Sequence, residues 1–234
     1  MTRKTEIKND SESLAHIYMA FDVSFRFLCQ IYLEVPDNKL MEKIFRNNLF
    51  FDWPVAEDQK TVSKGLKILQ DYSSQWKPEF ADALKRDYTR LFIGLEKILA
   101  PPYASVYLSE DFLMYEKPVL DVRRFYEKLD LSVNPMNKVP DDHIGFELYC
   151  LSFLCRNAAN AAEEHDNKKF YGYQSALREF LSDFLNTWLD SFLSKVKDKA
   201  QTSFYRGVAF LTSGLVESLS DCLEIEHLQN RDFF

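Results

Sequence analysis

The sequence predicts an all-α fold: a single helical domain of about eight or nine helices with irregular central loops. Apolar residues recur at three- and four-residue spacing along most of the 234 residues, as they do on the buried face of a helix. Glycine is scarce, with 6 Gly and 8 Pro, whereas hairpin-rich β folds need many glycine-containing turns. Hydrophobic residues make up 46% and charged residues 28% of the chain, which indicates a folded protein.

The N-terminal part is expected to contain two helices and an aromatic loop. One helix runs from Ser11 to Leu33 with its apolar side chains on one face, and Pro36 ends it. Asp37 is the expected N-cap of a short helix from Asn38 to about Asn47. The stretch from Leu49 to Pro54 is expected to be a loop that packs its aromatic rings inward.

The middle of the chain is expected to be helical with two interruptions. A helix from about Val55 to Gln75 is followed by another from Pro78 to about Phe92, which Gly94 can terminate. After an irregular stretch that begins at Pro101, a helix covers Pro118 to Leu129, and a polar linker runs from Ser132 to Pro140.

Three more helices are expected, from about Asp142 to Glu164, Lys168 to Lys195 and Thr202 to Leu223. We find no internal repeat and no Gly-rich phosphate loop, so residues 1–234 are interpreted as one domain. If the 132–140 linker acts as a hinge, the C-terminal helices could exchange between protomers in a domain-swapped dimer; we favour a monomer.

Composition also limits the function classes. No run approaches the roughly 18 apolar residues of a membrane-spanning helix, and the polar N-terminus has no apolar core of a secretory signal, so a cytoplasmic protein that is not an integral membrane protein is expected. Four scattered cysteines indicate buried thiols rather than a disulfide framework. The net charge of −7 argues against nucleic acid as a partner.

Three motifs occur in a fixed order in the central third. They are Asp87 to Phe92 (DYTRLF), Pro101 to Tyr107 (PPYASVY), and Pro140 with Asp142 to Gly145 (DHIG). In type, order and spacing they resemble the TorD/DmsD family of chaperones for molybdenum-containing redox enzymes. Two departures concern the loop, where Tyr103 stands in place of a common tryptophan and Ala104 in place of a frequent Glu or Gly.

The resemblance implies an all-helical chaperone that catalyses no reaction. Such proteins bind the twin-arginine signal peptide of a molybdopterin-containing oxidoreductase, and some also hold the immature, cofactor-free enzyme. They delay export until the cofactor has been inserted. No resident cofactor is expected for the chaperone itself, although the resemblance leaves open whether it contacts a guanine nucleotide or molybdopterin. The resemblance does not name the client reductase.

The residues of the motifs offer the chemistry that such a peptide needs, which is acidic groups beside apolar surface. The candidate binding residues are Arg90, Pro102, Tyr103, Ser105, Tyr107, Asp141, Asp142 and His143. Further acids at Glu110, Asp111, Glu116 and Glu147, and further aromatic area from Trp53 or Trp76, could contribute.

Each of these residues also has an ordinary structural interpretation. The two prolines enforce an extended connection, and Asp141 or Asp142 could be the N-cap of the next helix. His143 could hydrogen-bond a loop carbonyl, and Arg90 could anchor the loop through carbonyls or carboxylates rather than meet a ligand.

Other function classes are disfavoured. Ser105, His143 and Asp142 suggest a hydrolase triad, but there is no G-x-S-x-G elbow. A metal site from His143, Glu147, Cys150 and Cys155 lacks the expected ligand spacing. The alternative that stays open is a general helical scaffold, which docks another protein without reading its signal peptide.

Overall fold

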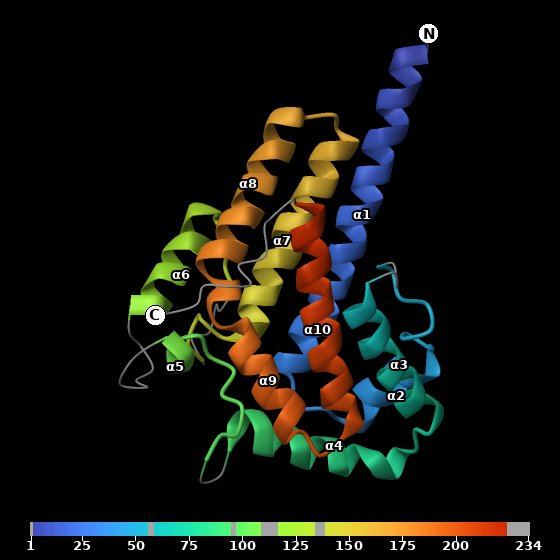
Figure 1. The fold of residues 1–234 in the computed structure, drawn as a ribbon, viewed down its shortest axis with the longest axis vertical. Coiled ribbons are helices and arrows are strands. Elements are labelled where there is room, and N and C mark those ends of the chain that lie inside the picture. Colours follow the sequence, from blue (N-terminus) through green and yellow to red (C-terminus); the bar gives the residue numbers. More distant parts are fainter. Residues whose placement is uncertain (1, 56–58, 95–96, 109–116, 134–138, 224–234) are drawn as a thin grey trace.

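A computed structural model describes residues 2–55, 59–94, 97–108, 117–133 and 139–223 of the chain. Within these ranges the regular elements are helices (Figure 1), so the predicted all-α class is confirmed. None of the helices in the described ranges combines the length and apolar character needed to cross a membrane.

The elements follow one another in two groups. The first contains α1 (Thr2–Leu33), α2 (Asn38–Arg46), α3 (Lys60–Ser74), the 3₁₀ turn η1 (Pro78–Phe80), α4 (Ala81–Tyr88) and the π-helical turn η2 (Thr89–Ile93). The second contains α5 (Ser105–Leu108), α6 (Lys117–Lys128), α7 (Ile144–Glu163), α8 (Asn167–Asp183), the 3₁₀ turn η3 (Leu185–Thr187), α9 (Leu189–Lys199) and α10 (Ser203–Cys222).

The core lies around α7 and α10, whose side chains are buried on most of their surface. The long α1 packs along α7, which also contacts α8, while α3 and α9 pack against α10 (Figure 1). Both α7 and α10 are rich in Leu, Ala and other small or apolar residues, as expected of helices surrounded by protein.

Helices α3 and α10 approach so closely that their backbones touch. A Cβ atom added at Gly214 would lie 2.5 Å from the Val62 amide nitrogen, and one added at Gly65 would lie 2.6 Å from the Leu211 amide nitrogen. These glycines therefore set the distance between the first and last thirds of the chain, because any side chain there would push the two helices apart.

Two local signals act as predicted. The Asp37 side chain accepts a hydrogen bond from the Leu40 amide at 2.7 Å and so caps α2. Gly94 ends η2 with φ 68°, a left-handed conformation that glycine adopts without strain. Both signals operate over a few residues, so the sequence displays them directly.

Two predicted helix boundaries are wrong. The first helix begins at Thr2 and not at Ser11, because its first residues are polar and give no apolar spacing to detect. The helix predicted from Lys168 to Lys195 is two helices, α8 and α9, separated by η3. The break allows α8 to pack on α7 and α9 to pack on α10, and it buries Leu185 and Trp188.

The remaining differences are smaller. The segment predicted as one helix from Pro78 to Phe92 consists of η1, α4 and η2 in succession, and the irregular stretch after Pro101 contains the helical turn α5. The helix expected from Val55 begins at Lys60. The central part of the 132–140 linker lies outside the described residues, so the hinge stays a prediction.

Candidate functional site

The second and third motifs are joined by backbone hydrogen bonds. The Ala104 amide donates to the Asp142 carbonyl at 3.1 Å, and the Ile144 amide donates to the Pro102 carbonyl at 2.9 Å. These bonds form an isolated antiparallel bridge between Tyr103 and His143. Two segments about forty residues apart are thereby held as one unit at the start of α7.

His143 is the N-cap of α7, because its Nδ1 accepts a hydrogen bond from the Gly145 amide at 3.0 Å. The alternative interpretation, in which Asp141 or Asp142 caps this helix, is therefore wrong. The imidazole packs edge-to-face with the Tyr103 ring, with 5.2 Å between the ring centroids. Burial lowers the pKa of His143 to about 3, so the ring is neutral at physiological pH.

This geometry disagrees with a hydrolase triad. In a triad the serine proton goes to one imidazole nitrogen while the other nitrogen donates to a carboxylate. Here Nδ1 is an acceptor, so the ring proton of the neutral His143 is on Nε2 and no basic nitrogen is left for a serine. Asp142 Oδ2 instead accepts from the Ser105 backbone amide at 2.7 Å.

The two aspartates attach the loop to its surroundings. Asp142 is fully buried and holds the first residue of α5, and burial raises its pKa against the opposing effect of the Ser105 hydrogen bonds. Asp141 pairs with the Arg123 guanidinium, and its carbonyl accepts from the Tyr126 hydroxyl at 3.3 Å. Both acids thus fix the loop against α5 and α6.

A second buried centre lies one turn further along α7. Glu147 is 1% exposed, and its Oε2 accepts a hydrogen bond from Trp188 Nε1 at 3.0 Å. The Trp188 ring packs on the Tyr107 ring at 5.5 Å, and Lys195 Nζ lies 4.4 Å from the centroid of that same ring. Burial raises the pKa of Glu147 well above its ordinary value, and nearby Asp142 adds to the shift.

A cavity of about 220 Å³ opens beside this centre, between α5, α6, α7 and the end of α8. It is lined by Ala104, Leu108, Lys117, Pro118, Asp121, Val122, Glu147, Asp183 and Phe184. The walls are largely apolar, and three of the lining residues are acidic against one that is basic.

Arg90 lies in a different place. Its Nη2 donates to the Lys199 carbonyl at 2.6 Å and to Asp87 Oδ1 at 3.1 Å. The buried Asp87 also accepts from the amide and hydroxyl of Thr202, at 2.7 Å and 2.8 Å. Asp87 and Arg90 therefore hold the junction between α9 and α10, and the structure does not bring Arg90 to the Tyr103–His143 bridge.

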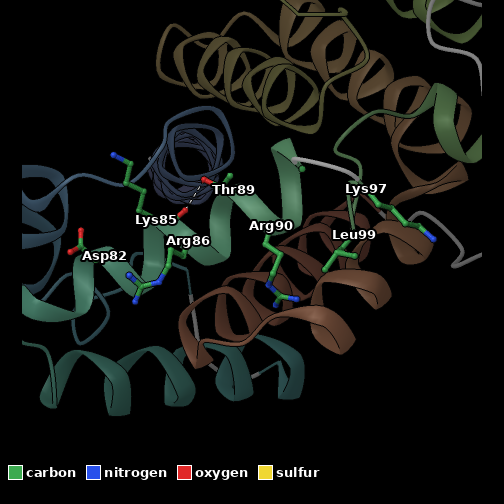
Figure 2. A pocket seen from close by; sticks show the side chains of 8 residues that line it. Asp82, Lys85, Arg86, Thr89, Arg90, Lys97 and Leu99 are labelled. Carbon is green, nitrogen blue, oxygen red and sulfur yellow. Dashed lines mark hydrogen bonds between the residues drawn. The ribbon is translucent and has the colours of Figure 1, made fainter.

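Arg90 instead lines a larger cavity of about 640 Å³ (Figure 2). Four of its lining residues are basic and one is acidic: Lys85, Arg86, Arg90 and Lys97 against Asp82. Figure 2 shows Lys85 and Lys97 pointing in opposite directions on the two sides of Arg90. The two cavities thus differ in charge as well as size.

The structure sorts the remaining candidates. Pro102, Ser105, Asp142 and His143 are buried and hold the loop, while Tyr103 and Tyr107 are only half-buried. Trp53 and Trp76 belong to a separate aromatic cluster with rings such as Phe50 and Phe45. The predictions for Glu110, Asp111 and Glu116 lie outside the described residues.

Sequence reasoning missed Trp188, the partner of Glu147. It placed Arg123 on a helix similar to the family's but gave it no role, whereas in the structure Arg123 pairs with Asp141. Trp188 is 41 positions from Glu147 and sits in a stretch that reads as continuous helix. No local pattern marks it as part of the site.

Comparison with known proteins gives consistent relatives. Residues 56–194 match the family model described as nitrate reductase delta subunit. Over 184 residues the chain is 26% identical to the probable Tat proofreading chaperone DmsD of Haemophilus influenzae, covering 77% of this chain and 80% of that protein. The chaperone protein YcdY of Escherichia coli is 26% identical over 210 residues, 87% of this chain and 96% of that protein. The chaperone protein TorD of Vibrio atlanticus is 33% identical over 128 residues, 55% of this chain and 58% of that protein.

Proposed function

This chain belongs to the TorD/DmsD family, and from this membership we propose that it is a redox-enzyme maturation chaperone. Its client is a molybdopterin-containing oxidoreductase, which it binds through the twin-arginine signal peptide, through the immature enzyme, or through both. It acts in the cytoplasm and delays export until the client's cofactor has been inserted. The resemblance inferred from the three motifs is confirmed by these relatives, which are named as chaperones and not as catalysts.

The observation that carries the proposed site is the bridge between Tyr103 and His143. It is backed by buried hydrogen bonds on both sides, so the loop that bears Tyr103 and Tyr107 is preorganised. A preorganised surface loses little conformational entropy when a peptide binds. Half-buried tyrosines offer broad contact area with few rotatable bonds.

Binding of a leader would need both kinds of contact. A surface ion pair contributes only about 0–1 kcal/mol, so arginines alone would bind weakly. Tyr103 and Tyr107 supply ring surface, and Leu108, which is 43% exposed, extends the apolar area toward the small cavity. An arginine pair followed by an apolar stretch would satisfy both types of group.

Fluorescence anisotropy with a labelled leader tests the proposal. The leader of the redox enzyme encoded beside this chain's own gene is titrated with the full chain, and saturable binding is expected. The double variant Tyr103→Ala with His143→Asn is expected to weaken binding about tenfold or more. Asparagine can still accept the Gly145 amide hydrogen bond, so α7 keeps a cap.

The matched control is Tyr171→Ala with His16→Ala, because both residues are exposed and neither belongs to the motifs. The control is expected to bind like the unaltered chain. Unchanged binding by the Tyr103/His143 variant would remove these two motifs from the binding site.

The general helical scaffold makes a different prediction. A scaffold that does not read the leader binds the leaderless mature enzyme as strongly as the full precursor. A chaperone that reads the leader binds the precursor more tightly. Pull-down of the two client forms at equal concentration distinguishes them, and light scattering on the same samples tests the expected monomer against a domain-swapped dimer.

A further inference from the structure

The two cavities have opposite character toward a cation. The larger one carries Lys85, Arg86, Arg90 and Lys97, so it would repel an arginine side chain. The smaller one carries three carboxylates and a single lysine. Electrostatic complementarity therefore assigns a guanidinium to the smaller cavity.

Glu147 is the innermost acid of the smaller cavity and has an incomplete set of partners. Its Oε2 accepts from Trp188 Nε1, whereas its other oxygen accepts no hydrogen bond from any described residue, and no lysine or arginine in the described ranges forms an ion pair with it. The Glu147 residue is nevertheless only 1% exposed to solvent. A buried carboxyl group without a counter-charge is costly to ionise.

The acids at the rim are placed differently. Asp121 pairs with Arg124 at 3.1 Å on the solvent side of α6, and Asp183 accepts from Ser182 Oγ at 2.7 Å at the end of α8. Both are accessible to solvent, so they attract a cation without binding it strongly. Glu147 is the only lining acid in the described ranges whose charge would be desolvated.

We propose that the cavity lined by Glu147, Asp121 and Asp183 holds the guanidinium group of one arginine from the client's leader, with Glu147 as the receiving carboxylate. The inference rests on the proposed function, since it names a subsite for the same peptide. The apolar walls from Val122 and Phe184 can contact the methylene stem, and Leu108, an exposed residue of the same wall, offers apolar surface to the rest of the peptide.

Size and hydrogen-bond geometry favour arginine. The volume of about 220 Å³ is below the roughly 300–1,000 Å³ of pockets for drug-sized ligands, so it suits one side chain rather than a cofactor. The guanidinium group has five N–H donors in a plane and is weakly hydrated. It can therefore bond the free oxygen of Glu147 and a rim carboxylate at once, which a lysine ammonium matches less well.

Occupation of this subsite should release a proton. Burial raises the pKa of Glu147 well above its ordinary value, whereas a bound guanidinium would lower this pKa by favouring the ionised carboxylate. The titratable and charged groups around Glu147 are Asp142 before α7, Cys150 on α7, Lys117, Asp121 and Tyr126 on α6, and Asp183 on α8. Negative charge on Asp142 raises the pKa of Glu147 further, so the proton release depends on the guanidinium outweighing that charge.

The test uses isothermal titration calorimetry with the full chain and a synthetic peptide that has two adjacent arginines followed by an apolar stretch. Matched peptides carry lysine or glutamine in place of each arginine in turn. The variant Glu147→Gln keeps the shape and the Trp188 hydrogen bond but cannot ionise, and Glu163→Gln is the control, because it removes an exposed acid from the same helix.

We expect Glu147→Gln to weaken the two-arginine peptide roughly ten- to a hundredfold, as loss of a charge-assisted hydrogen bond would, while Glu163→Gln changes nothing. One of the two single-arginine peptides should bind equally to Glu147→Gln and to the unaltered chain, because its missing arginine is the one that Glu147 receives. Repeating the titration in buffers of different ionisation enthalpy should show proton release with the unaltered chain and less with Glu147→Gln.

The outcomes separate this subsite from the proposed function. If the unaltered chain binds the two-arginine peptide and Glu147→Gln binds it equally well, the subsite is wrong and the chaperone function stands. If lysine peptides bind as tightly as arginine peptides, the guanidinium assignment is wrong. If the unaltered chain does not bind the two-arginine peptide at all, both the leader-binding function and the subsite are refuted.

Discussion

Replacing His143 with asparagine is expected to remove part of the acid sensitivity of the fold. His143 caps α7 through Nδ1 and packs against Tyr103 in a buried position. Protonation would convert the accepting nitrogen into a donor that faces the Gly145 amide, and it would place a charge where water cannot reach it. Asparagine preserves the accepting oxygen and does not titrate.

The magnitude follows from the pKa of His143, which burial lowers from 6.5 to about 3. Between these two values the unfolded chain binds a proton that the folded chain does not, so the free energy of unfolding falls as the pH falls below 6.5. The loss is absent near neutral pH and reaches about 2 kcal/mol at about pH 5. Below the folded pKa of about 3 it stops growing.

Urea unfolding followed by circular dichroism, at several pH values from about 7.5 to 5, measures this difference. His143→Asn is expected to lose stability at neutral pH, because the edge-to-face ring contact is worth about 1 kcal/mol. This loss from the missing ring contact is the same at every pH. The additional fall in the free energy of unfolding between neutral pH and pH 5 should be about 2 kcal/mol smaller in the variant than in the unaltered chain. The exposed His16→Asn serves as a control. Parallel pH profiles for His143→Asn and the unaltered chain would refute the buried neutral histidine.

Three further predictions concern stability and thiol chemistry. Asp87→Ala should lower the free energy of unfolding by about 3 kcal/mol, because this carboxylate on α4 joins Arg90 of η2 to the start of α10. Asp82→Ala, an exposed change on α4, should alter the free energy of unfolding by less than about 0.5 kcal/mol in the same urea assay. Gly214→Ala should lower the free energy of unfolding by about 1–3 kcal/mol, since its Cβ would meet α3. Gly172→Ala, with open space around it, should raise the free energy of unfolding by up to about 1 kcal/mol. Equal melting temperatures for the two variants would contradict the close approach of α3 and α10. With a thiol reagent under native conditions Cys222 should react first, and rapid reaction of any of the other three cysteines, which are buried, would contradict the core assignment.

Signals that act within a few residues could be predicted from the sequence. The capping of α2 by Asp37 needs only the next three residues, and the end of η2 at Gly94 needs only the backbone freedom of that glycine. Helical spacing also predicts the large elements, since α7 and α10 bury apolar side chains on most of their turns.

Structural features that depend on a distant partner could not be predicted from the sequence. Nothing between Lys168 and Lys195 breaks a helix locally, because the stretch contains no proline and its one glycine, Gly172, lies within α8. The break at Phe184 to Trp188 arises from packing on two different helices. Arg90 belongs to the first of the three motifs that resemble the family, yet its guanidinium donates a hydrogen bond to the carbonyl of Lys199, 109 positions later.

The surroundings of the candidate site also depend on distant partners. The pairing of the loop around Tyr103 with the DHIG segment was inferred from resemblance and not from spacing, and the structure places the two segments in direct contact. Which members of that set are buried and which face a cavity depends on α6, α8 and α9. The sequence alone does not predict which helices lie next to Glu147.

The glycine contacts between α3 and α10 also constrain the order of events during synthesis. The end of α3 at Ser74 and the start of α10 at Ser203 are separated by about 130 residues, which a ribosome adds in roughly 6 to 26 seconds at about 5–20 residues per second. Throughout that interval α3 can contact earlier residues such as Phe45, whose ring lies 5.8 Å from that of Tyr72, but the face that meets α10 is uncovered. The first and last thirds of the chain can therefore pack together only after synthesis is almost complete, so this contact forms late and not while the chain is growing.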